Sequence, residues 1–346
     1  MRDQGKAIQQ FIIKNLPNHA TDIVAIAMRK FSVTRTTVLR HLNYLIVENK
    51  ATKTGRTRQI QYFLTRNLNK SIKIALPTKS NEFLLWKKYF ETPVRTFTNQ
   101  NTFDICEYGF TEMVNNVIDH SRAKQLILTS RAEKNNIILT IEDNGLGALY
   151  KLGKTLSLND YRDVILELTK GKQTSDPEKH SGEGIFFSSK IFDYFTLESN
   201  GFCYSVDNIE KDYFLKTLEP KTSGTKIILE IHRHAKRKLI DVFQSFQDPE
   251  NFSFNRTYIH VELAKLEGER FISRSQAKRI LRGLAEKFTH IVLDFKQVRI
   301  VGQGFVDEVF RVFKNQHSHI MIEYCNANPD VEFMIKRGII SAEKNL

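Results

Sequence analysis

Apolar residues recur every three or four positions through the first part of the chain, and this spacing predicts α-helices. A first helix is expected at about 4–16, where Pro17 stops it. A second is expected at about 21–30. The turn at 32–34 carries two hydroxyl side chains, either of which can cap a third helix that reaches to about 49.

Two segments after the third helix, 51–54 and 59–64, alternate enough to predict a β-hairpin, and the turn between them is basic. Three helices followed by a basic hairpin resemble a winged helix-turn-helix domain, which we expect at residues 1–70. That resemblance implies DNA contacts from the start of the third helix and from the hairpin. The implied DNA-binding residues are Arg35, Thr36, Thr37, Arg40, Lys53, Arg56 and Arg58.

The distribution of charge favours DNA as the partner of this domain. The chain has a formal net charge of +13, and residues 1–70 hold +10 of it, from 13 Lys and Arg against 3 Asp and Glu. A concentrated basic segment is typical of proteins that bind the phosphate backbone. The alternative is a winged helix that docks on protein, with the charge serving solubility.

A different pattern follows in the central part of the chain. Apolar spacing predicts helices at 83–90 and 103–120, and the segments after them predict strands at 125–132 and 136–142. The second strand runs directly into a glycine-containing turn. These elements frame the segments that carry the candidate chemistry.

Four short segments of this central part occur in a fixed order. They are Glu112 with Asn116, the run DNGLG at 143–147, the run GEG at 182–184 and the pair GT at 224–225. Because Glu112 and Asn116 are four residues apart, they share one face of the second predicted helix. Each segment alone is ordinary in turns or on helix surfaces. The order and spacing together predict a pocket for ATP and a metal ion.

The residue types suit that chemistry. A hard cation takes oxygen ligands, and an Asn carbonyl supplies one without adding negative charge beside phosphates. Attack of water on a γ-phosphate needs a carboxylate within hydrogen-bond distance. Glycines let backbone amides approach phosphate oxygens, and a helix N-terminus favours anions there.

The four segments resemble those of the GHKL ATPase superfamily, which includes gyrase, the histidine kinases, the MutL mismatch-repair proteins and the anti-sigma kinases. The resemblance lies within an expected domain at residues 80–235 and implies a two-layer α/β sandwich that binds ATP and Mg²⁺. By this resemblance Asn116 coordinates Mg²⁺, Glu112 is the general base that activates the attacking group, and Asp143 accepts the adenine amino group.

The resemblance also implies roles for four glycines and a threonine. Gly145 and Gly147 let the backbone pass close to the adenine base, and Thr225 supports that end of the nucleotide. Gly182 and Gly184 lie where a lid meets a helix N-terminus, and they cradle phosphates there.

Residues 148–181 are polar, and we expect them to form this lid, mobile until nucleotide binds. Lys172, Lys179 or His180 is expected to reach the γ-phosphate, and the alternative for each is a solvated side chain. His120 as a phosphate acceptor is a further alternative. No two-helix hairpin with an acceptor histidine precedes the pocket, which disfavours an ordinary sensor histidine kinase.

The last part of the chain, residues 256–346, alternates strands with helices and predicts a small α/β domain. The expected strands are 258–263, 270–272, 291–295 and 320–324, and the expected helices are 275–287, 304–313 and 331–336. This pattern resembles STAS domains of the anti-anti-sigma type. Regulatory members carry a phosphorylated Ser or Thr at a strand-to-helix turn, but the turn at 301–305 has no hydroxyl. The departure favours docking on a protein partner, on a second copy or within the chain.

The chain as a whole is expected to be cytoplasmic. It has 346 residues, no apolar run long enough to span a bilayer, and an N-terminus without the apolar core of a secretory signal. Cys106, Cys203 and Cys325 are far apart in the sequence. This spacing is not typical of a disulfide framework or of a cysteine zinc site.

Three functions remain open from the sequence. The favoured one is a DNA-binding regulator that binds ATP and hydrolyses it with Mg²⁺. In this function the nucleotide controls engagement of DNA or of a partner, and the sequence leaves a homodimer open. The second is a serine/threonine protein kinase of the anti-sigma type that acts on a STAS-like partner. The third is a scaffold that binds ATP without hydrolysing it.

Overall fold

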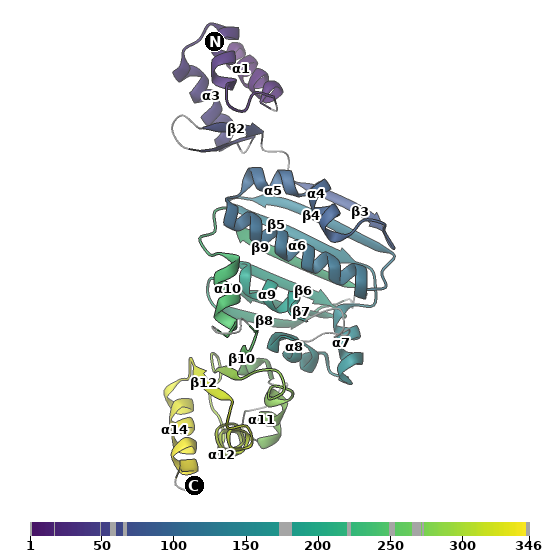
Figure 1. Cartoon of the computed structure of the whole chain (residues 1–346), viewed down its shortest axis with the longest axis vertical. Helices are drawn as coiled ribbons and strands as arrows, with labels where there is room; N and C mark the ends of the chain where they lie inside the picture. The colour runs from purple at the N-terminus through teal and green to yellow at the C-terminus, as the bar shows by residue number, and fades with distance from the viewer. Residues whose placement is uncertain are drawn as a thin grey trace.

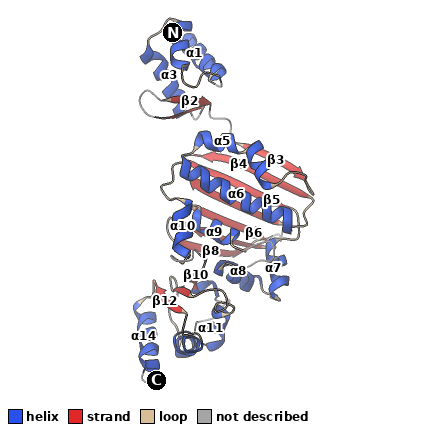
Figure 2. Ribbon diagram, viewed as in Figure 1, coloured by secondary structure: helices blue, strands red, loops and turns tan. Residues whose placement is uncertain are grey.

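The chain folds into three consecutive units, each with its own sheet (Figure 1). The computed structural model describes residues 2–16, 18–48, 50–55, 60–64, 68–172, 182–219, 223–248, 253–264, 271 and 273–343. Helices lie beside the sheets in every unit, so the molecule is a multidomain protein of mixed helices and strands (Figure 2). None of the described helices is both long enough and apolar enough to cross a bilayer.

The N-terminal unit begins with α1 (Arg2–Asn15), α2 (Ile23–Phe31) and α3 (Arg35–Val47), which confirms the three predicted helices. Each helix contributes apolar side chains to a core separate from that of the rest of the chain, including Ile12, Ala27, Val38 and Leu42. Thr34 caps α3, because its hydroxyl oxygen accepts a hydrogen bond from the Thr37 amide at 3.3 Å.

An antiparallel hairpin completes this unit. Strand β1 (Ala51–Thr54) pairs with β2 (Gln61–Leu64), and Tyr62 is buried against the helices. The predicted hairpin is confirmed. Its turn, which carries Arg56 and Arg58, lies outside the described residues.

The central unit is built on a seven-stranded antiparallel sheet in the order β3-β4-β5-β9-β6-β7-β8. Its strands are β3 (Lys70–Ala75), β4 (Gln125–Glu133), β5 (Asn136–Asp143), β6 (Tyr194–Ser199), β7 (Phe202–Asp207), β8 (Asp212–Thr217) and β9 (Thr225–His232). Alternate residues point into the core, as Ile227, Leu229 and Ile231 do on β9. The strands predicted at 125–132 and 136–142 are confirmed as β4 and β5.

Helices cover one face of this sheet (Figure 1). They are α4 (Glu82–Tyr89), α5 (Glu91–Phe97), α6 (Gln100–His120), α9 (Gly184–Ile191) and α10 (Leu239–Phe246). The long helix α6 packs against β5 and β9, at the middle of the sheet. Trp86 of α4 stacks on Phe90 with a centroid distance of 6.4 Å. It also packs at a tilted angle against Phe110 of α6 with a centroid distance of 5.2 Å, which fixes α4 against α6.

Residues 148–170 form two helices, α7 (Ala148–Leu156) and α8 (Tyr161–Lys170), rather than the mobile lid that we expected. The lid prediction was wrong there because the polar residues conceal a buried apolar face on α8. The side chains of that face are Val164, Ile165, Leu166 and Leu168. The remaining lid residues from 173 to 181, including Lys179 and His180, lie outside the described residues.

The C-terminal unit contains a three-stranded parallel sheet in the order β10-β11-β12. Its elements are β10 (Arg256–His260), the 3₁₀ turn η2 (Val261–Ala264), α11 (Arg274–Leu281), β11 (His290–Asp294), α12 (Gln303–Asp307), the π-helical segment η3 (Glu308–Phe313), α13 (Lys314–Gln316), β12 (Met321–Cys325) and α14 (Pro329–Glu343). The predicted alternation of strands and helices is confirmed. One apolar core continues from the central unit into this one, so the two units pack together.

Candidate functional site

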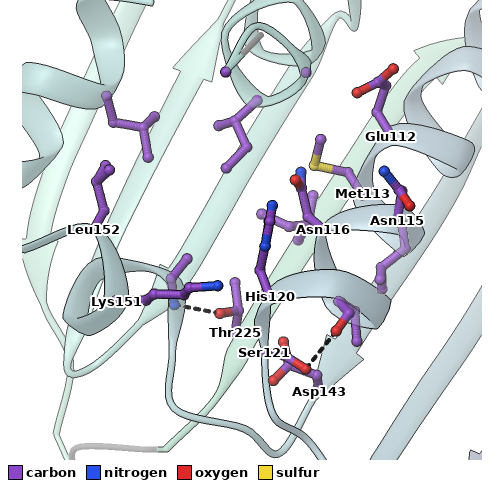
Figure 3. Close-up of a pocket in the computed structure, with 18 of the residues that line it drawn as sticks. Glu112, Met113, Asn115, Asn116, His120, Ser121, Asp143, Lys151, Leu152 and Thr225 are labelled. Carbon is purple, nitrogen blue, oxygen red and sulfur yellow. Dashed lines mark hydrogen bonds between the residues drawn. The ribbon is translucent and has the colours of Figure 1, made fainter. Parts of the chain in front are cut away.

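A cavity of about 320 Å³ lies between α6, the α7–α8 segment, the start of α9 and the paired ends of β5 and β9 (Figure 3). Its walls bring together residues from all four segments that the sequence singled out. These residues are Glu112, Asn116, Asp143, Gly147, Gly182, Gly184 and Thr225. The predicted site residues outside the lining are Gly145 and Lys172.

Asp143 ends β5 at one side of the cavity and is 5% exposed. Its Oδ1 accepts a hydrogen bond from the Gly145 amide at 2.7 Å. Burial raises the pKa of this carboxyl, while hydrogen bonds from Gly145 and Thr225 act in the opposite direction. A fixed, poorly solvated carboxylate of this kind can accept a hydrogen bond from an N–H group of a ligand.

Thr225 faces Asp143 across the paired strands β5 and β9. Its hydroxyl oxygen accepts a hydrogen bond from the Ala148 amide at 2.8 Å, drawn as a dashed line in Figure 3. This bond satisfies an amide of the first turn of α7, which otherwise has no partner within the helix. Thr225 therefore ties the start of α7 to the sheet at the cavity.

Gly145 lies in the tight turn that follows Asp143. A Cβ on Gly145 would lie 2.1 Å from the Ser121 carbonyl oxygen, a backbone atom that has no room to move. Only glycine fits at this position, since the turn brings the backbone after β5 against the end of α6. Gly145 thus shapes the site without lining it.

The helix α6 presents a row of polar side chains to the cavity: Glu112, Asn115, Asn116 and His120. Figure 3 shows the four along one wall. Met113 and Val117, between them on the helix, are buried. The helical repeat therefore sets an apolar face into the core and this polar row beside it.

The Glu112 carboxylate lies against the first residue of α9. A Cβ on Gly184 would lie 2.2 Å from Glu112 Oε2. Burial raises the pKa of the neighbouring Tyr108 hydroxyl, and the negative charges of Glu112 and Glu183 raise it further. Two carboxylates therefore converge near this end of the cavity, where a cation would be stabilised.

A metal ion here would need ligands beyond the ionisable side chains. Among the described residues, no group of three or more His, Cys, Asp or Glu is arranged to hold a metal ion. The polar row of α6 offers the amide oxygens of Asn115 and Asn116 in addition. Such oxygens suit a hard cation that takes its other ligands from a bound anion or water.

Lys172 was expected to reach the γ-phosphate, but its side chain points elsewhere. Its Nζ donates a hydrogen bond to the Lys287 carbonyl oxygen at 3.0 Å and lies 5.3 Å from the Phe254 ring centroid. Burial lowers the pKa of this ammonium. The C-terminal unit supplies this environment, so sequence spacing around Lys172 could not have revealed it.

Lys151 on α7 is a cavity residue that the sequence analysis missed. It lies one turn after Gly147, so a signal existed. A helix that begins directly at the glycine turn carries its first-turn residues toward the same cavity as the turn. Leu152 and Leu168 add apolar surface to this part of the wall.

The predicted DNA-binding residues that are described lie on the N-terminal unit. Arg35, Thr36 and Arg40 are exposed on α3, Thr37 is half-buried beside its cap, and Lys53 is exposed on β1. They are remote from the cavity along the chain and belong to the unit with a separate core.

Comparison with known proteins concerns the C-terminal unit. A family model described as a STAS-like domain of unknown function (DUF4325) matches residues 276–332, from α11 into α14. No curated protein matches the chain. The predicted STAS-like character of the C-terminal domain is therefore confirmed.

Proposed function

We propose that the chain is an ATP-binding regulator with a GHKL-type pocket, which hydrolyses ATP with Mg²⁺ and uses its nucleotide state to control DNA binding. One observation carries the proposal. Four segments spread over residues 112–225 converge on or beside a single cavity, and they are the segments in which the sequence resembles GHKL ATPases.

The adenine end of the nucleotide would lie beside Asp143. Its buried carboxylate, held by the Gly145 amide, suits acceptance of the adenine amino group. Thr225 faces it across the strand pair and lines the same cavity. The glycine turn that includes Gly147 supports a close approach of the base to the backbone.

The phosphates would lie between α6 and the start of α9. Gly182 and Gly184 line this end of the cavity, and amides at a helix N-terminus favour anions. Lys151 also lines the cavity, beside Thr225 in Figure 3, and offers the nucleotide a cation from α7. Mg²⁺, when bound, would neutralise phosphate charge, and Asn116 would supply an oxygen ligand.

Glu112 would act as the general base. Its carboxylate lies against Gly184, hence near the amides proposed to hold the phosphates. It would accept a proton from the attacking water as the bond from the water oxygen to the γ-phosphorus forms and the bond from that phosphorus to the β–γ bridging oxygen breaks, which releases ADP and phosphate. Hydrolysis therefore depends on Glu112, whereas binding depends more on Asp143.

DNA binding would belong to the N-terminal unit. The exposed Arg35 and Arg40 on α3, together with Lys53, support contact with a phosphate backbone. The net charge of +10 over residues 1–70 favours the same partner. The STAS-like domain would contribute docking, in keeping with the absence of a hydroxyl from its turn at 301–305.

The test combines calorimetric binding of Mg²⁺-ATP with phosphate release, each measured with and without duplex DNA. We expect Asp143→Asn to lose binding, and Glu112→Ala to bind ATP but release no phosphate. The matched control is Glu142→Gln, an exposed carboxylate next to Asp143. Failure of the wild type to bind ATP would overturn the proposal. Labelled phosphoprotein in place of free phosphate would favour the kinase alternative.

A further inference from the structure

The helix α8 contacts both the cavity and the STAS-like domain. Leu168 lines the cavity wall. Its neighbours Glu167 and Lys170 are 4% and 0% exposed, and α8 packs against β10 and η2. Figure 1 shows α8 on the side of the central unit that faces β10 and α11. The helix α8 thus belongs both to the cavity wall and to the contact with the STAS-like domain.

A charge cluster, buried at Glu167 and Lys170 and exposed at Arg282, joins α8 to the STAS-like domain. Lys170 Nζ donates to Glu167 Oε1 at 2.8 Å and to the Arg282 carbonyl oxygen at 3.0 Å. The Arg282 guanidinium donates twice to Glu167 Oε1, at 2.9 and 3.1 Å. Thr257 on β10 donates its hydroxyl to the Lys170 carbonyl oxygen at 2.7 Å. A buried ammonium and carboxylate need such partners, and the STAS-like domain provides them.

A second polar contact follows directly along the chain. Lys172 Nζ donates to the Lys287 carbonyl oxygen at 3.0 Å, and Lys287 Nζ donates to the Lys172 carbonyl oxygen at 3.3 Å. The C-terminal end of α8 and the residues after it are therefore held on both backbone and side-chain atoms. This geometry exists only when the two units are packed together.

An aromatic contact path reaches the cavity from the same domain. Phe186 on α9 lines the cavity, and its ring centroid lies 4.9 Å from that of Phe254. Phe254 in turn lies 5.4 Å from Phe288, which is buried in the STAS-like domain. A Cβ on Gly171 would lie 2.8 Å from the Phe254 ring, so this ring also packs closely against the residue that follows α8.

We propose that the STAS-like domain is a built-in regulator of the nucleotide pocket, which acts by docking on α8 and α9 through the Glu167–Lys170–Arg282 cluster and the Phe186–Phe254–Phe288 path. Docked, it fixes two walls of the cavity through Leu168 and Phe186. Undocked, those walls lose their support, and a ligand must order them on binding. The nature of the ligand rests on the proposed function, whereas the mechanical link does not.

The coupling is reciprocal. If docking favours a ligand in the cavity, the ligand must favour docking by the same factor. A partner protein that binds the docking face of the STAS-like domain would therefore compete with the cavity ligand. A ligand-dependent gain in order is expected in β10 and α11, which do not touch the cavity.

The test uses the full chain with Arg282→Ala, which removes one arm of the cluster but leaves Lys170 paired with Glu167. The matched control is Arg274→Ala at the first residue of α11, the helix that Arg282 follows directly. The ion pair of Arg274 with Asp307 stays within the STAS-like domain. Amide hydrogen exchange of α8 and α9 is measured without ligand, and Mg²⁺-ATP affinity is measured by calorimetry. We expect faster exchange and an affinity about fivefold weaker, at the low end of ordinary coupling, for Arg282→Ala alone.

The outcomes separate the two claims. If the wild type binds no ATP, the proposed function fails and the ligand-free exchange decides this inference. Unchanged exchange in α8 and α9 of Arg282→Ala would then overturn it, and faster exchange would support it. If the wild type binds ATP, equal affinities of Arg282→Ala and the wild type overturn the coupling. Slower exchange in β10 and α11 on addition of Mg²⁺-ATP, absent from Arg282→Ala, supports it.

Discussion

Gly184 and Glu112 are so close that a Cβ on Gly184 would lie 2.2 Å from Glu112 Oε2. The atom that would have to move is the far end of a flexible side chain. A methyl group here would therefore displace the Glu112 carboxylate and leave the backbone in place.

This relationship gives the first prediction. We expect Gly184→Ala to lower ATP turnover by roughly 10²-fold, the contribution of a positioned general base, with ATP affinity changed much less. The melting temperature should stay close to that of the wild type. Steady-state phosphate release, calorimetric binding and thermal unfolding together test this. Undiminished turnover would show that Glu112 is not the base.

Gly145→Ala is the contrasting variant. Its Cβ would lie 2.1 Å from the Ser121 carbonyl oxygen, and a backbone atom cannot rotate away. We therefore expect a loss of stability of about 1–3 kcal/mol, as in other overpacked sites. The two variants make the same chemical change, so a difference between them isolates what the methyl group meets.

The helix and strands that carry the candidate residues could be predicted because their apolar periodicity is long and regular. The helix expected at 103–120 is confirmed within α6, and the strand at 136–142 within β5. These two elements hold Glu112, Asn116 and Asp143. That these residues share one cavity was predicted from the order of the four segments along the chain. The arrangement itself depends on the sheet order β5-β9-β6, which local periodicity does not encode.

Other features depend on contacts between residues far apart in the chain, and local reading missed them. Lys172 looks like a phosphate ligand by position, yet it is held by Lys287 and Phe254. The helix α8 reads as a polar loop until its packing against the STAS-like domain is known. The buried pair of Glu167 and Lys170 has no local signal either, because its further partner Arg282 lies 112 residues after Lys170 in the chain.

Lys151 gives the second prediction. It is a cation of the described cavity lining and lies one turn after Gly147. We expect Lys151→Ala to weaken ATP binding by on the order of tenfold, as for the loss of a charged hydrogen bond, and to weaken adenosine binding little. Lys154→Ala, three residues further along α7, is the matched control. Competition titrations with ATP, ADP and adenosine measure the difference, and equal losses for all three would contradict a phosphate contact.

The third prediction concerns DNA. Arg35 and Arg40 are exposed at the start and middle of α3. Reversing both charges should weaken duplex binding by tenfold or more, and should flatten the dependence of log affinity on log salt by about one to two units. Each single reversal, Arg35→Glu or Arg40→Glu, is also compared with Lys14→Glu on α1, which changes the net charge by the same amount. Fluorescence anisotropy at several salt concentrations provides the measurement, and an unchanged salt slope would contradict contact through α3.

Asp294 gives the last prediction, because it is a charged group held inside the STAS-like domain at 2% exposure. Its carboxylate accepts hydrogen bonds from His260 Nδ1 at 2.8 Å, the Lys296 amide at 3.0 Å and Asn326 Nδ2 at 2.9 Å. Burial alone would raise the pKa, but these hydrogen bonds outweigh it and hold the pKa of Asp294 at about 2.

A depressed carboxyl pKa stabilises the fold above the unfolded value of 3.8, and that stability is lost as pH falls toward the folded value of about 2. The shift corresponds to about 2 kcal/mol. We expect Asp294→Asn to destabilise the STAS-like domain at pH 7, by an amount that shrinks as pH falls from about 4 to about 2. Urea unfolding across this range tests it against Asp330→Asn, an exposed carboxylate on α14. A deficit independent of pH would show that Asp294 acts through packing rather than charge.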